Sequence, residues 1–224
     1  MTVVASGYEL QAFELYETET WATNSLIEYL GLPAGALIWE PAAGNHKIAD
    51  TLLASGMRTI TSDITVHNRE HDFIADFYGD FEIPDVAGII TNPPFGRRNM
   101  LAARFARLCL QRCPGWIALL LTAKFDFAKT RMDLFANNPR FAAKVSLLDR
   151  IQWFAGENQG TEDHAWYIWA PAPGIGAGNA RMAYGTNPAA RRGRSATIAI
   201  SQTLASEVSA LLNARARVSE AACL

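Results

Sequence analysis

A tetrapeptide in the middle of the chain is suited to binding an amino group. Asn92-Pro93-Pro94-Phe95 directly follows the uncharged, apolar run 86–91, which predicts a buried strand. Two consecutive prolines end such a strand because they cannot donate to its hydrogen-bond ladder. The Asn92 amide oxygen and the Pro93 carbonyl can then accept the two hydrogens of an NH2 group, while Phe95 can stack on a planar ring that carries it. A stiff turn without a ligand is the structural alternative.

Three earlier segments each follow a predicted strand and are suited to binding a nucleoside. Residues 40–44, Glu-Pro-Ala-Ala-Gly, form a turn of small side chains that lets the backbone approach a ligand closely. Asp63 can accept hydrogen bonds from both ribose hydroxyls, as acids do in dinucleotide sites. The carboxylate of Asp76, which precedes Phe77, can accept the exocyclic amine of an adenine whose ring lies against apolar side chains.

Each of these segments also has an interpretation that needs no ligand. Tight turns between a strand and a helix are common, and Asp63 can be a helix N-cap before Val66. Asp72-Phe73 offers a competing register for Asp76-Phe77. In open α/β sheets, however, ligands bind at the carboxyl ends of the strands near the topological switch point, where all four segments are expected.

The rest of the chain predicts the elements that position these residues. Apolar periodicity and stop signals predict helices over residues 21–30, 47–54, 100–110 and 130–135. Apolar runs predict strands over residues 36–39, 59–62, 73–75, 86–91, 116–121, 144–153 and 164–170. Alternating strands and helices that finish in a strand pair predict an α/β fold. We expect a Rossmann-like, doubly wound, mostly parallel seven-stranded sheet with an antiparallel edge strand.

The chain is expected to form one compact domain with an extension. Single α/β domains commonly have about 200–250 residues, and this chain has 224, so residues 1–170 are assigned to one domain. Pro, Gly, Ala and Asn dominate residues 171–190, which predicts a linker or an ordered surface loop. Residues 196–217 predict a strand-like start and an amphipathic helix. We therefore expect residues 171–224 to be a linker and C-terminal extension packed on the same domain.

Composition excludes several classes of protein. Half of the residues are hydrophobic and 19% are charged, which is typical of a globular protein. No run approaches the ~18 apolar residues of a membrane span, and residues 1–6 lack the basic start of a signal peptide. Cys109 and Cys113 have no second pair to complete a zinc site, so they predict buried thiols and no metal site. These features predict a cytoplasmic protein without disulfides and without a membrane partner.

The formal net charge of −2 limits how nucleic acid can be bound. Proteins that hold duplex DNA mainly through its phosphates usually carry a basic excess, so such contacts would have to come from local basic groups. One candidate group follows the tetrapeptide and the other lies near the C-terminus: Arg97, Arg98, Arg104 and Arg107, and Arg191, Arg192 and Arg194. Solvated helix faces for the first group, and a linker for the second, are the alternatives.

With these residues identified, the chain resembles the class I S-adenosylmethionine-dependent methyltransferases, in particular N6-adenine DNA methyltransferases of the short phage and prophage type. The likeness covers about residues 13–170, and Asn92 to Phe95 match the catalytic tetrapeptide of the family in full. The segment 16–21 is similar to one that lies against the methionine end of the cofactor. The resemblance implies a cofactor site made of Thr18, Glu40, Pro41, Ala42, Gly44, Asp63, Ile64, Asp76, Phe77 and Asn92. It assigns catalysis to Asn92, Pro93, Pro94 and Phe95.

The sequence departs from the family pattern in two segments. Asn45-His46 replaces the acid and the second glycine of the cofactor loop, so the His46 side chain is expected to crowd the methionine end. Glu17 and Glu19 replace the prolines that flank the position of Thr18. The pattern also shows no separate target-recognition domain, so sequence specificity is expected to be low or to depend on a partner subunit.

The resemblance implies methyl transfer from S-adenosyl-L-methionine to the N6 amino group of adenine, in DNA rather than RNA. In a duplex the target base must first be extruded and stacked in the pocket. Phe95 would be one wall and Phe125 or Phe154 the other, although either of the last two can be a core residue. Methylation of RNA adenine or of a protein glutamine, or a cofactor-binding inactive subunit, are the alternatives.

Overall fold

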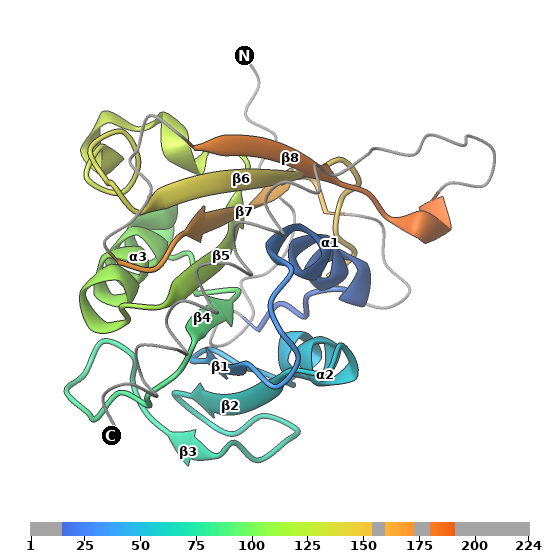
Figure 1. The fold of residues 1–224 in the computed structure, drawn as a ribbon, viewed down its shortest axis with the longest axis vertical. Coiled ribbons are helices and arrows are strands. Elements are labelled where there is room, and N and C mark those ends of the chain that lie inside the picture. Colours follow the sequence, from blue (N-terminus) through green and yellow to red (C-terminus); the bar gives the residue numbers. More distant parts are fainter. Residues whose placement is uncertain (1–14, 154–159, 173–179, 191–224) are drawn as a thin grey trace, which may run out of the picture.

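A mixed, eight-stranded sheet organises the part of the chain that the computed structural model describes, residues 15–153, 160–172 and 180–190. Its spatial order is β3-β2-β1-β4-β5-β7-β6-β8 (Figure 1). The strands are β1 (Leu37–Glu40), β2 (Arg58–Asp63), β3 (Phe73–Ile74), β4 (Gly88–Thr91), β5 (Trp116–Thr122), β6 (Phe141–Leu147), β7 (His164–Trp169) and β8 (Arg181–Gly185). The α-helices of this part are α1 (Thr20–Leu30), α2 (Lys47–Ala54) and α3 (Met100–Arg112). Short 3-10 turns are η2 (Arg97–Asn99), η3 (Phe125–Phe127), η4 (Lys129–Arg131) and η6 (Pro188–Ala190).

The order of the strands reverses beside β1. β1 pairs in parallel with β2 on one side and with β4 on the other, so the topological switch point lies there. β3 and β5 extend these two parallel halves. β7 runs antiparallel to both β5 and β6, and β8 pairs in parallel with β6. The predicted doubly wound, mostly parallel sheet with its antiparallel strand toward one edge is confirmed, with eight strands in the described residues rather than seven.

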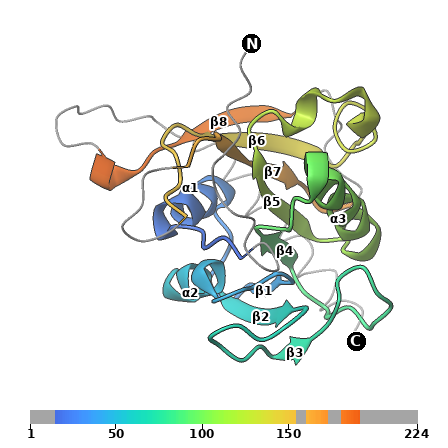
Figure 2. The same cartoon turned by 180° about the vertical axis from the view of Figure 1, so that it is seen from behind.

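The sheet lies between two layers of helices. α1 and α2 cover one face and α3 covers the other (Figures 1 and 2). On the first face Leu26 of α1 and Leu52 of α2 belong to one apolar cluster with Trp166 of β7. On the second face Phe105 of α3 belongs to another with Trp39 of β1. Every residue of β5 and β7 is buried, which explains why their sequences show no polar alternation.

Helix boundaries follow the local signals of the sequence closely. α2 has the bounds that the sequence predicts, while α1 begins one residue earlier and α3 ends two residues later than predicted. Gly31 ends α1 in the left-handed conformation, with a φ of 56°, and its amide donates to the Ile27 carbonyl. Glycine adopts this conformation without a steric cost, so it is a reliable stop signal.

Some predicted elements are wrong in type or in bounds. Residues 130–135 form η4 and further turns instead of a helix, because their backbone bonds, such as Leu134 N to Arg131 O, span three residues rather than four. The strand predicted over residues 144–153 is β6, which ends at Leu147 because the paired strand β8 ends opposite it. β8 itself lies in the segment 171–190, where the sequence predicts a linker or surface loop. The elements predicted over 196–217 lie outside the described residues.

Arg140 connects the C-terminal end of α3 to the sheet. Its buried guanidinium donates hydrogen bonds to the carbonyl of Cys113 (2.9 Å) and, more weakly, to that of Leu110 (3.2 Å) at the end of α3. It also donates to the carbonyl of Ala170 (2.8 Å), directly after β7. Four donated bonds, the last to Gly115, satisfy a buried cation that would otherwise be costly.

Cys109 and Cys113 are buried thiols without a disulfide, as the sequence predicts. Burial raises the pKa of Cys109 well above its ordinary value, so this thiol stays protonated. No helix within the described ranges is long and apolar enough to cross a membrane. In the same ranges, no group of three or more His, Cys, Asp or Glu side chains is placed to hold a metal ion.

Candidate active site

A pocket of about 260 Å³ opens at the carboxyl ends of β1, β2 and β4, beside the switch point. Its wall includes Glu40 at the end of β1, Asp63 at the end of β2 and Asn92 directly after β4. All residues that the sequence assigns to a cofactor site line it: Thr18, Glu40, Pro41, Ala42, Gly44, Asp63, Ile64, Asp76, Phe77 and Asn92. The fold therefore brings five separate sequence segments to one cavity.

The turn after β1 needs a residue without a side chain at Gly44. Gly44 has a φ of 48°, and a Cβ atom there would lie 2.7 Å from Cδ1 of Leu15. The amide of Gly44 donates a hydrogen bond of 2.9 Å to Oδ2 of Asp63. A larger residue would displace the segment before α1 and disturb this bond, so the small turn residues serve the shape of the pocket.

Asp63 holds the pocket wall together. Its Oδ2 atom accepts the Gly44 amide and its Oδ1 atom accepts the Ile64 amide at 2.7 Å. No helix begins before Val66, so Asp63 is not the N-cap that the sequence left open. Each carboxylate oxygen has a second lone pair, so Asp63 can still accept hydroxyl groups of a ligand in the pocket.

Glu40 combines a place in the pocket wall with a structural role. Its side chain is 2% exposed, and its Oε2 atom accepts a hydrogen bond of 2.9 Å from the amide of Ala49, in the first turn of α2. This bond satisfies one of the amides that a helix start leaves without an intrahelical partner. Burial raises the pKa of Glu40 well above its ordinary value. Glu40 thus fixes the start of α2 against the end of β1.

His46 does not line the pocket, contrary to the expected crowding of the methionine end. It precedes α2 in the left-handed conformation, with a φ of 66°, which is the conformation that the glycine of the family pattern would adopt freely. Its imidazole points to His71, with 2.8 Å between Nε2 of His46 and Nδ1 of His71. The side chain is therefore accommodated outside the cavity.

The other departures from the family pattern are bonded to one another or to the core. Nδ2 of Asn45 donates to Oε1 of Glu17 at 2.7 Å, so the residues that replace an acid and a proline form a pair. Oε2 of Glu19 accepts the indole N–H of Trp21 (2.9 Å) and the amide of Gln152 (2.8 Å). These bonds hold the segment before α1 without the stiffness of proline.

The structure distinguishes the two registers proposed for the adenine-binding pair. Oδ2 of Asp72 accepts the amide and the hydroxyl of Thr61 at 2.7 Å and 2.9 Å, so Asp72 joins β2 to the strand beside it and does not line the pocket. Asp76 and Phe77 do line it. The Phe77 ring stacks on Phe105 of α3 with 3.9 Å between centroids, which fixes the apolar side of the cavity.

The tetrapeptide follows β4 at the edge of the same pocket. Asn92 and Pro94 line the cavity. Pro93 is buried and Phe95 is partly buried, and neither of them lines the cavity. The Phe95 ring faces His164, with 6.0 Å between centroids and 27° between planes. Nδ2 of Asn92 donates to the carbonyl of Tyr16 at 3.2 Å. Asn92 is thus oriented by the segment that precedes α1.

An aromatic row continues from Phe95 through His164 and Trp153 to Tyr16. His164 lies 5.0 Å from Trp153, and Trp153 lies 5.7 Å from Tyr16, both with their rings nearly perpendicular. Phe125 is fully buried in the core, so its assignment as a wall is wrong. The other expected wall, Phe154, lies outside the described residues.

His164 is neutral under ordinary conditions. It is 4% exposed, and burial lowers its pKa to about 4. Its Nδ1 atom is buried and has no hydrogen-bond partner among the described residues. Thr18 has a similar unpaired atom, since its hydroxyl is buried, lines the pocket and bonds to no described residue. An orphaned hydroxyl in a cavity wall is suited to a polar group of a bound ligand.

The donor and acceptor groups of the pocket fit the cofactor that the sequence resemblance implies. Asp63 and Asp76 supply carboxylate acceptors in the cavity wall, and Phe77 supplies an apolar surface. These groups suit ribose hydroxyls and an adenine amine. The unpaired hydroxyl of Thr18 belongs to the segment expected at the methionine end.

Several lining residues were missed from the sequence: Leu15, Tyr78, His67, Leu101 and Phe105. Leu101 and Phe105 lie one turn apart on α3, so the predicted helix 100–110 contained the signal that they share a face. Tyr78 directly follows the predicted pair 76–77. His67 lies in an irregular loop, and no pattern in the sequence indicated its place.

Comparisons with known proteins identify the fold. A protein described as an RNA methyltransferase from Pyrococcus horikoshii superposes with a TM-score of 0.54 and 14% identity, over 68% of this chain and 83% of that one. The methyltransferase subunit of a type I restriction-modification system from Streptococcus thermophilus superposes with a TM-score of 0.51 and 12% identity, over 70% of this chain. The chain has the class I methyltransferase fold.

A third structure adds to this likeness. A protein described as the modification subunit of a type I restriction enzyme from Vibrio vulnificus superposes with a TM-score of 0.54 and 15% identity, over 80% of this chain. The chain spans only 45% and 48% of the two restriction subunits. Neither a protein-family model nor a curated protein sequence matches the chain.

Proposed function

We propose that this chain is an S-adenosyl-L-methionine-dependent methyltransferase that methylates the N6 amino group of adenine in DNA. The observation that carries the proposal is the position of the tetrapeptide. It follows β4 at the switch point, and its Asn92 and Pro94 line the same cavity as Asp63 and Asp76. The residues proposed to bind a nucleoside and Asn92, one of the two proposed acceptors for an amino group, therefore line one pocket.

The cofactor would be held by residues of the first three strands and of the segment before α1. Asp63 would accept the ribose hydroxyls, Asp76 the adenine amine, and the hydroxyl of Thr18 would bind at the methionine end. The bound cofactor supplies an activated methyl group. Because Gly44 and Ile64 already bond to Asp63, this part of the wall has its shape before any ligand enters.

The tetrapeptide would act on the target nitrogen. The lone pair of an adenine amine is delocalised into the ring, which makes the nitrogen a poor nucleophile. Oδ1 of Asn92 and the carbonyl of Pro93 would accept hydrogen bonds from its two N–H groups and so favour the pyramidal nitrogen of the transition state. The remaining requirement is alignment of the nitrogen with the methyl group, and it needs no strong general base.

The base itself would be held by Phe95. The Phe95 ring packs on His164, which in turn contacts Trp153. A buried, neutral ring therefore packs against Phe95, the residue proposed to stack on the base. The type I restriction neighbours act within multisubunit systems, as their names state. By analogy with these subunits, we propose that target recognition by this chain depends on a partner subunit.

Two measurements test the proposal. Calorimetry with S-adenosyl-L-methionine tests binding, and transfer of a tritiated methyl group to separate pools of DNA, RNA and protein tests the substrate. We expect binding and transfer to DNA adenine, and loss of transfer in Asn92→Ala. Transfer to RNA or to protein alone would show that DNA is not the substrate. Binding of the cofactor without methyl transfer would indicate an inactive subunit, and absence of cofactor binding would contradict the proposal.

A further inference from the structure

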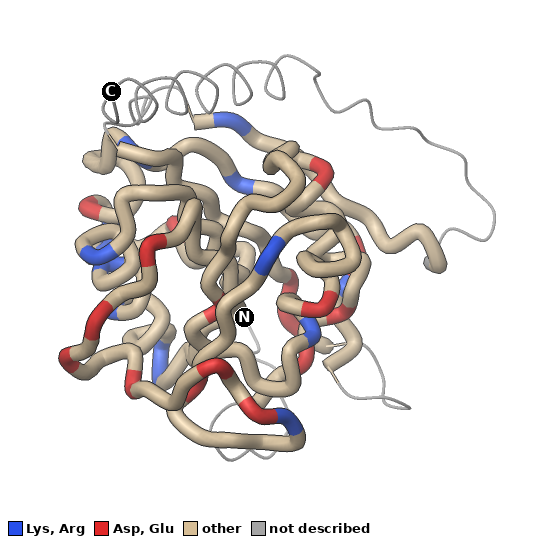
Figure 3. The backbone as a smooth tube through the Cα atoms, turned by 60° about the horizontal axis from the view of Figure 1, so that its bottom comes forward, with Lys and Arg blue, Asp and Glu red and all other residues tan. Residues whose placement is uncertain are grey.

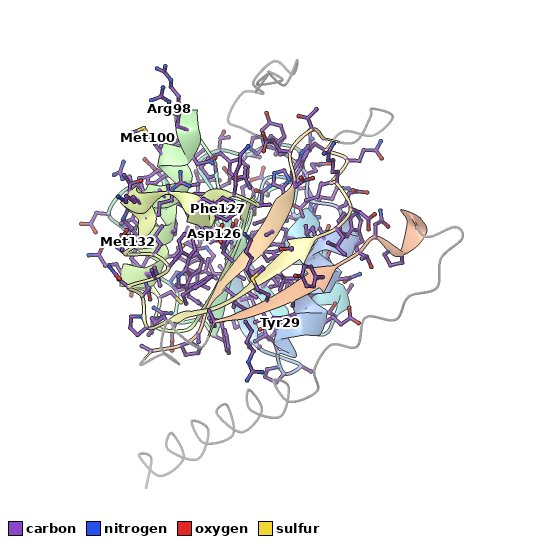
Figure 4. The ribbon with its side chains drawn as sticks, turned by 90° about the horizontal axis from the view of Figure 1, so that it is seen from above. Tyr29, Arg98, Met100, Asp126, Phe127 and Met132 are labelled. Atoms are coloured by element: carbon purple, nitrogen blue, oxygen red, sulfur yellow. The ribbon has the colours of Figure 1, made fainter. Side chains whose placement is uncertain are left out.

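A second surface lies on the turns that follow β4 and β5, and its Met100 directly precedes Leu101, which lines the pocket. Large apolar side chains are exposed there: Phe127 by 80%, Met100 by 69% and Met132 by 46%. Figure 4 shows these three side chains on the same side of the molecule, together with Arg98. A group of exposed apolar side chains marks an interaction site, whereas single ones need no explanation. The η2–η4 surface is defined here as Arg97, Arg98, Met100, Phe127, Lys129 and Met132.

Arg131 joins the turns that build this surface. Its guanidinium donates to the carbonyl of Arg98 in η2 (3.2 Å) and to that of Phe125 in η3 (2.6 Å), and it lies 4.0 Å from the centroid of the Phe125 ring. The side-chain amide of Asn99 donates to the hydroxyl of Thr122 at the end of β5 (3.2 Å). The η2–η4 surface is therefore held in a fixed position directly after the tetrapeptide.

The η2–η4 surface belongs to a basic segment of the sequence. Residues 96–133 contain eight Lys and Arg but two Asp and no Glu, in a chain whose net charge is −2. Residues 61–90, around β3, contain seven Asp and Glu and one Arg. Figure 3 brings the β3 side forward and shows acidic positions recurring along its loops. Arg104 and Arg112 of the basic segment lie on the rings of Tyr78 and Phe77 in the acidic segment, so the cations that remain at the η2–η4 surface come from the turns and not from the length of α3.

The acids of the basic segment are already paired. Asp133 lies 2.6 Å from Nε of Arg107, and Asp126 lies 3.0 Å from Nζ of Lys144. Arg107, which the sequence suggests as a nucleic-acid contact, therefore already forms an ion pair with Asp133. The exposed cations of the surface that have no acidic partner among the described residues are Arg97, Arg98 and Lys129.

We infer that the η2–η4 surface binds a single-stranded polynucleotide beside the base that enters the pocket, an inference that rests on the proposed function. An exposed ring such as Phe127 stacks on an unpaired base, and the neighbouring cations pair with phosphates. The Lys144 ammonium lies 5.3 Å from the centroid of this ring, which is still 80% exposed, and a duplex, which hides the faces of its bases, offers nothing to stack on it. Duplex binding also requires a wide basic surface. The segment around β3 is instead rich in Asp and Glu. A single strand, moreover, requires no extrusion of the target base.

Fluorescence anisotropy with the full chain tests the inference. The labelled probes are single-stranded DNA and RNA of about 12 nucleotides and the corresponding DNA duplex, at one fixed salt concentration. We expect at least one single strand to bind at least ~10-fold more tightly than the duplex. Phe127→Ala should weaken that binding about 5- to 100-fold, the range for loss of one stacked base, and Phe127→Trp should retain it. Leu53→Ala, which removes another exposed apolar side chain on α2, is the matched control.

Each other outcome overturns the inference. Equal or tighter binding of the duplex would do so, and so would a Phe127→Ala variant that binds single strands like the unmodified chain. Self-association that Phe127→Ala abolishes, without binding of any probe, would assign the surface to a second copy of the chain.

Calorimetric cofactor binding and methyl transfer, measured on the same samples, keep the two proposals apart. If Phe127→Ala methylates duplex DNA as well as the unmodified chain, the proposed function stands and the inference fails. If no cofactor binds, the proposed function fails and the anisotropy still decides whether the surface binds a single strand.

Discussion

The side-chain amide of Asn92 donates a hydrogen bond of 3.2 Å to the backbone carbonyl of Tyr16, 76 positions earlier in the sequence. The bond engages Nδ2 of Asn92 with the segment before α1, so the Oδ1 atom is the part of the amide left to accept a hydrogen bond from an amino substrate. The segment before α1 therefore orients the residue at the centre of the proposed site.

Asn92→Ala should separate cofactor binding from catalysis. We expect the binding free energy of the cofactor to change by less than about 0.5 kcal/mol, because no cofactor contact of the first three strands is removed. Methyl transfer should fall at least ~100-fold, the effect of removing one preorganised transition-state hydrogen bond. Calorimetry and single-turnover transfer on one preparation measure both quantities. A variant that is less stable but fully active per folded molecule would show that the tetrapeptide is only a stiff turn.

Asp63→Ala should weaken binding of S-adenosylhomocysteine by ~1.5–3 kcal/mol, because charge-assisted hydrogen bonds to two hydroxyls are lost. Asp72→Ala is the control, since Asp72 bonds to Thr61 at the neighbouring strand and does not line the pocket. That variant should lower thermal stability and leave the affinity unchanged. Titration calorimetry measures both variants, and unchanged affinity in Asp63→Ala would place the ribose site elsewhere.

His46→Gly should leave cofactor affinity unchanged or improve it, because the imidazole contacts His71 rather than the cavity. The backbone of His46 is left-handed, which costs a residue with a side chain ~1–2 kcal/mol. The glycine variant should therefore be more stable than His46→Ala by about 1 kcal/mol in urea unfolding, since both lose the same imidazole. A large loss of affinity in His46→Gly would show instead that the imidazole is a cofactor contact.

The free energy of unfolding should fall between pH 6.5 and pH 4 because of His164. Burial lowers the pKa of His164 to about 4, so in this range the unfolded chain binds a proton that the folded chain does not. The full contribution is present above pH 6.5 and is lost as the pH falls toward 4, amounting to about 3 kcal/mol.

His164→Gln isolates this contribution from that of Glu40, whose raised pKa affects both proteins equally. Urea unfolding of the two chains between pH 4 and pH 7 gives the difference in stability as a function of pH. A difference that stays constant over this range would mean that His164 is protonated as readily in the folded chain as in the unfolded one.

The pocket residues could be found from the sequence because parallel strands end at one edge of a sheet. Asp63 directly ends β2 and Asn92 directly follows β4, so a correct assignment of strands was enough to place both beside the turn after β1. Asp72 and Asp76 could not be distinguished in this way. Only the bond of Asp72 to Thr61, made across two strands, shows which of the two faces the cavity.

The parts that could not be predicted depend on tertiary contacts. Glu17 and Asn45 each replace a residue of the family pattern, but Asn45 donates a hydrogen bond to Glu17, 28 positions earlier in the sequence. β8 is formed by Arg181–Gly185, a segment with mostly exposed side chains and no apolar alternation, which becomes a strand by pairing with β6. Phe125 follows the carboxyl end of β5, yet it packs inward on Phe135 and Tyr167.

The bonds of Arg140 give the helix behind the tetrapeptide one fixed end. Carbonyls at the C-terminal end of α3 are held to the sheet by Arg140, so the helix cannot slide along its axis. At its other end, Arg98 and Asn99 have left-handed backbones with φ of 56° and 58°. The carbonyl of Phe95 accepts the amide of Ala102 in the first turn of α3 (3.3 Å), so an incoming base meets a ring whose backbone is anchored to a helix that is itself fixed to the sheet.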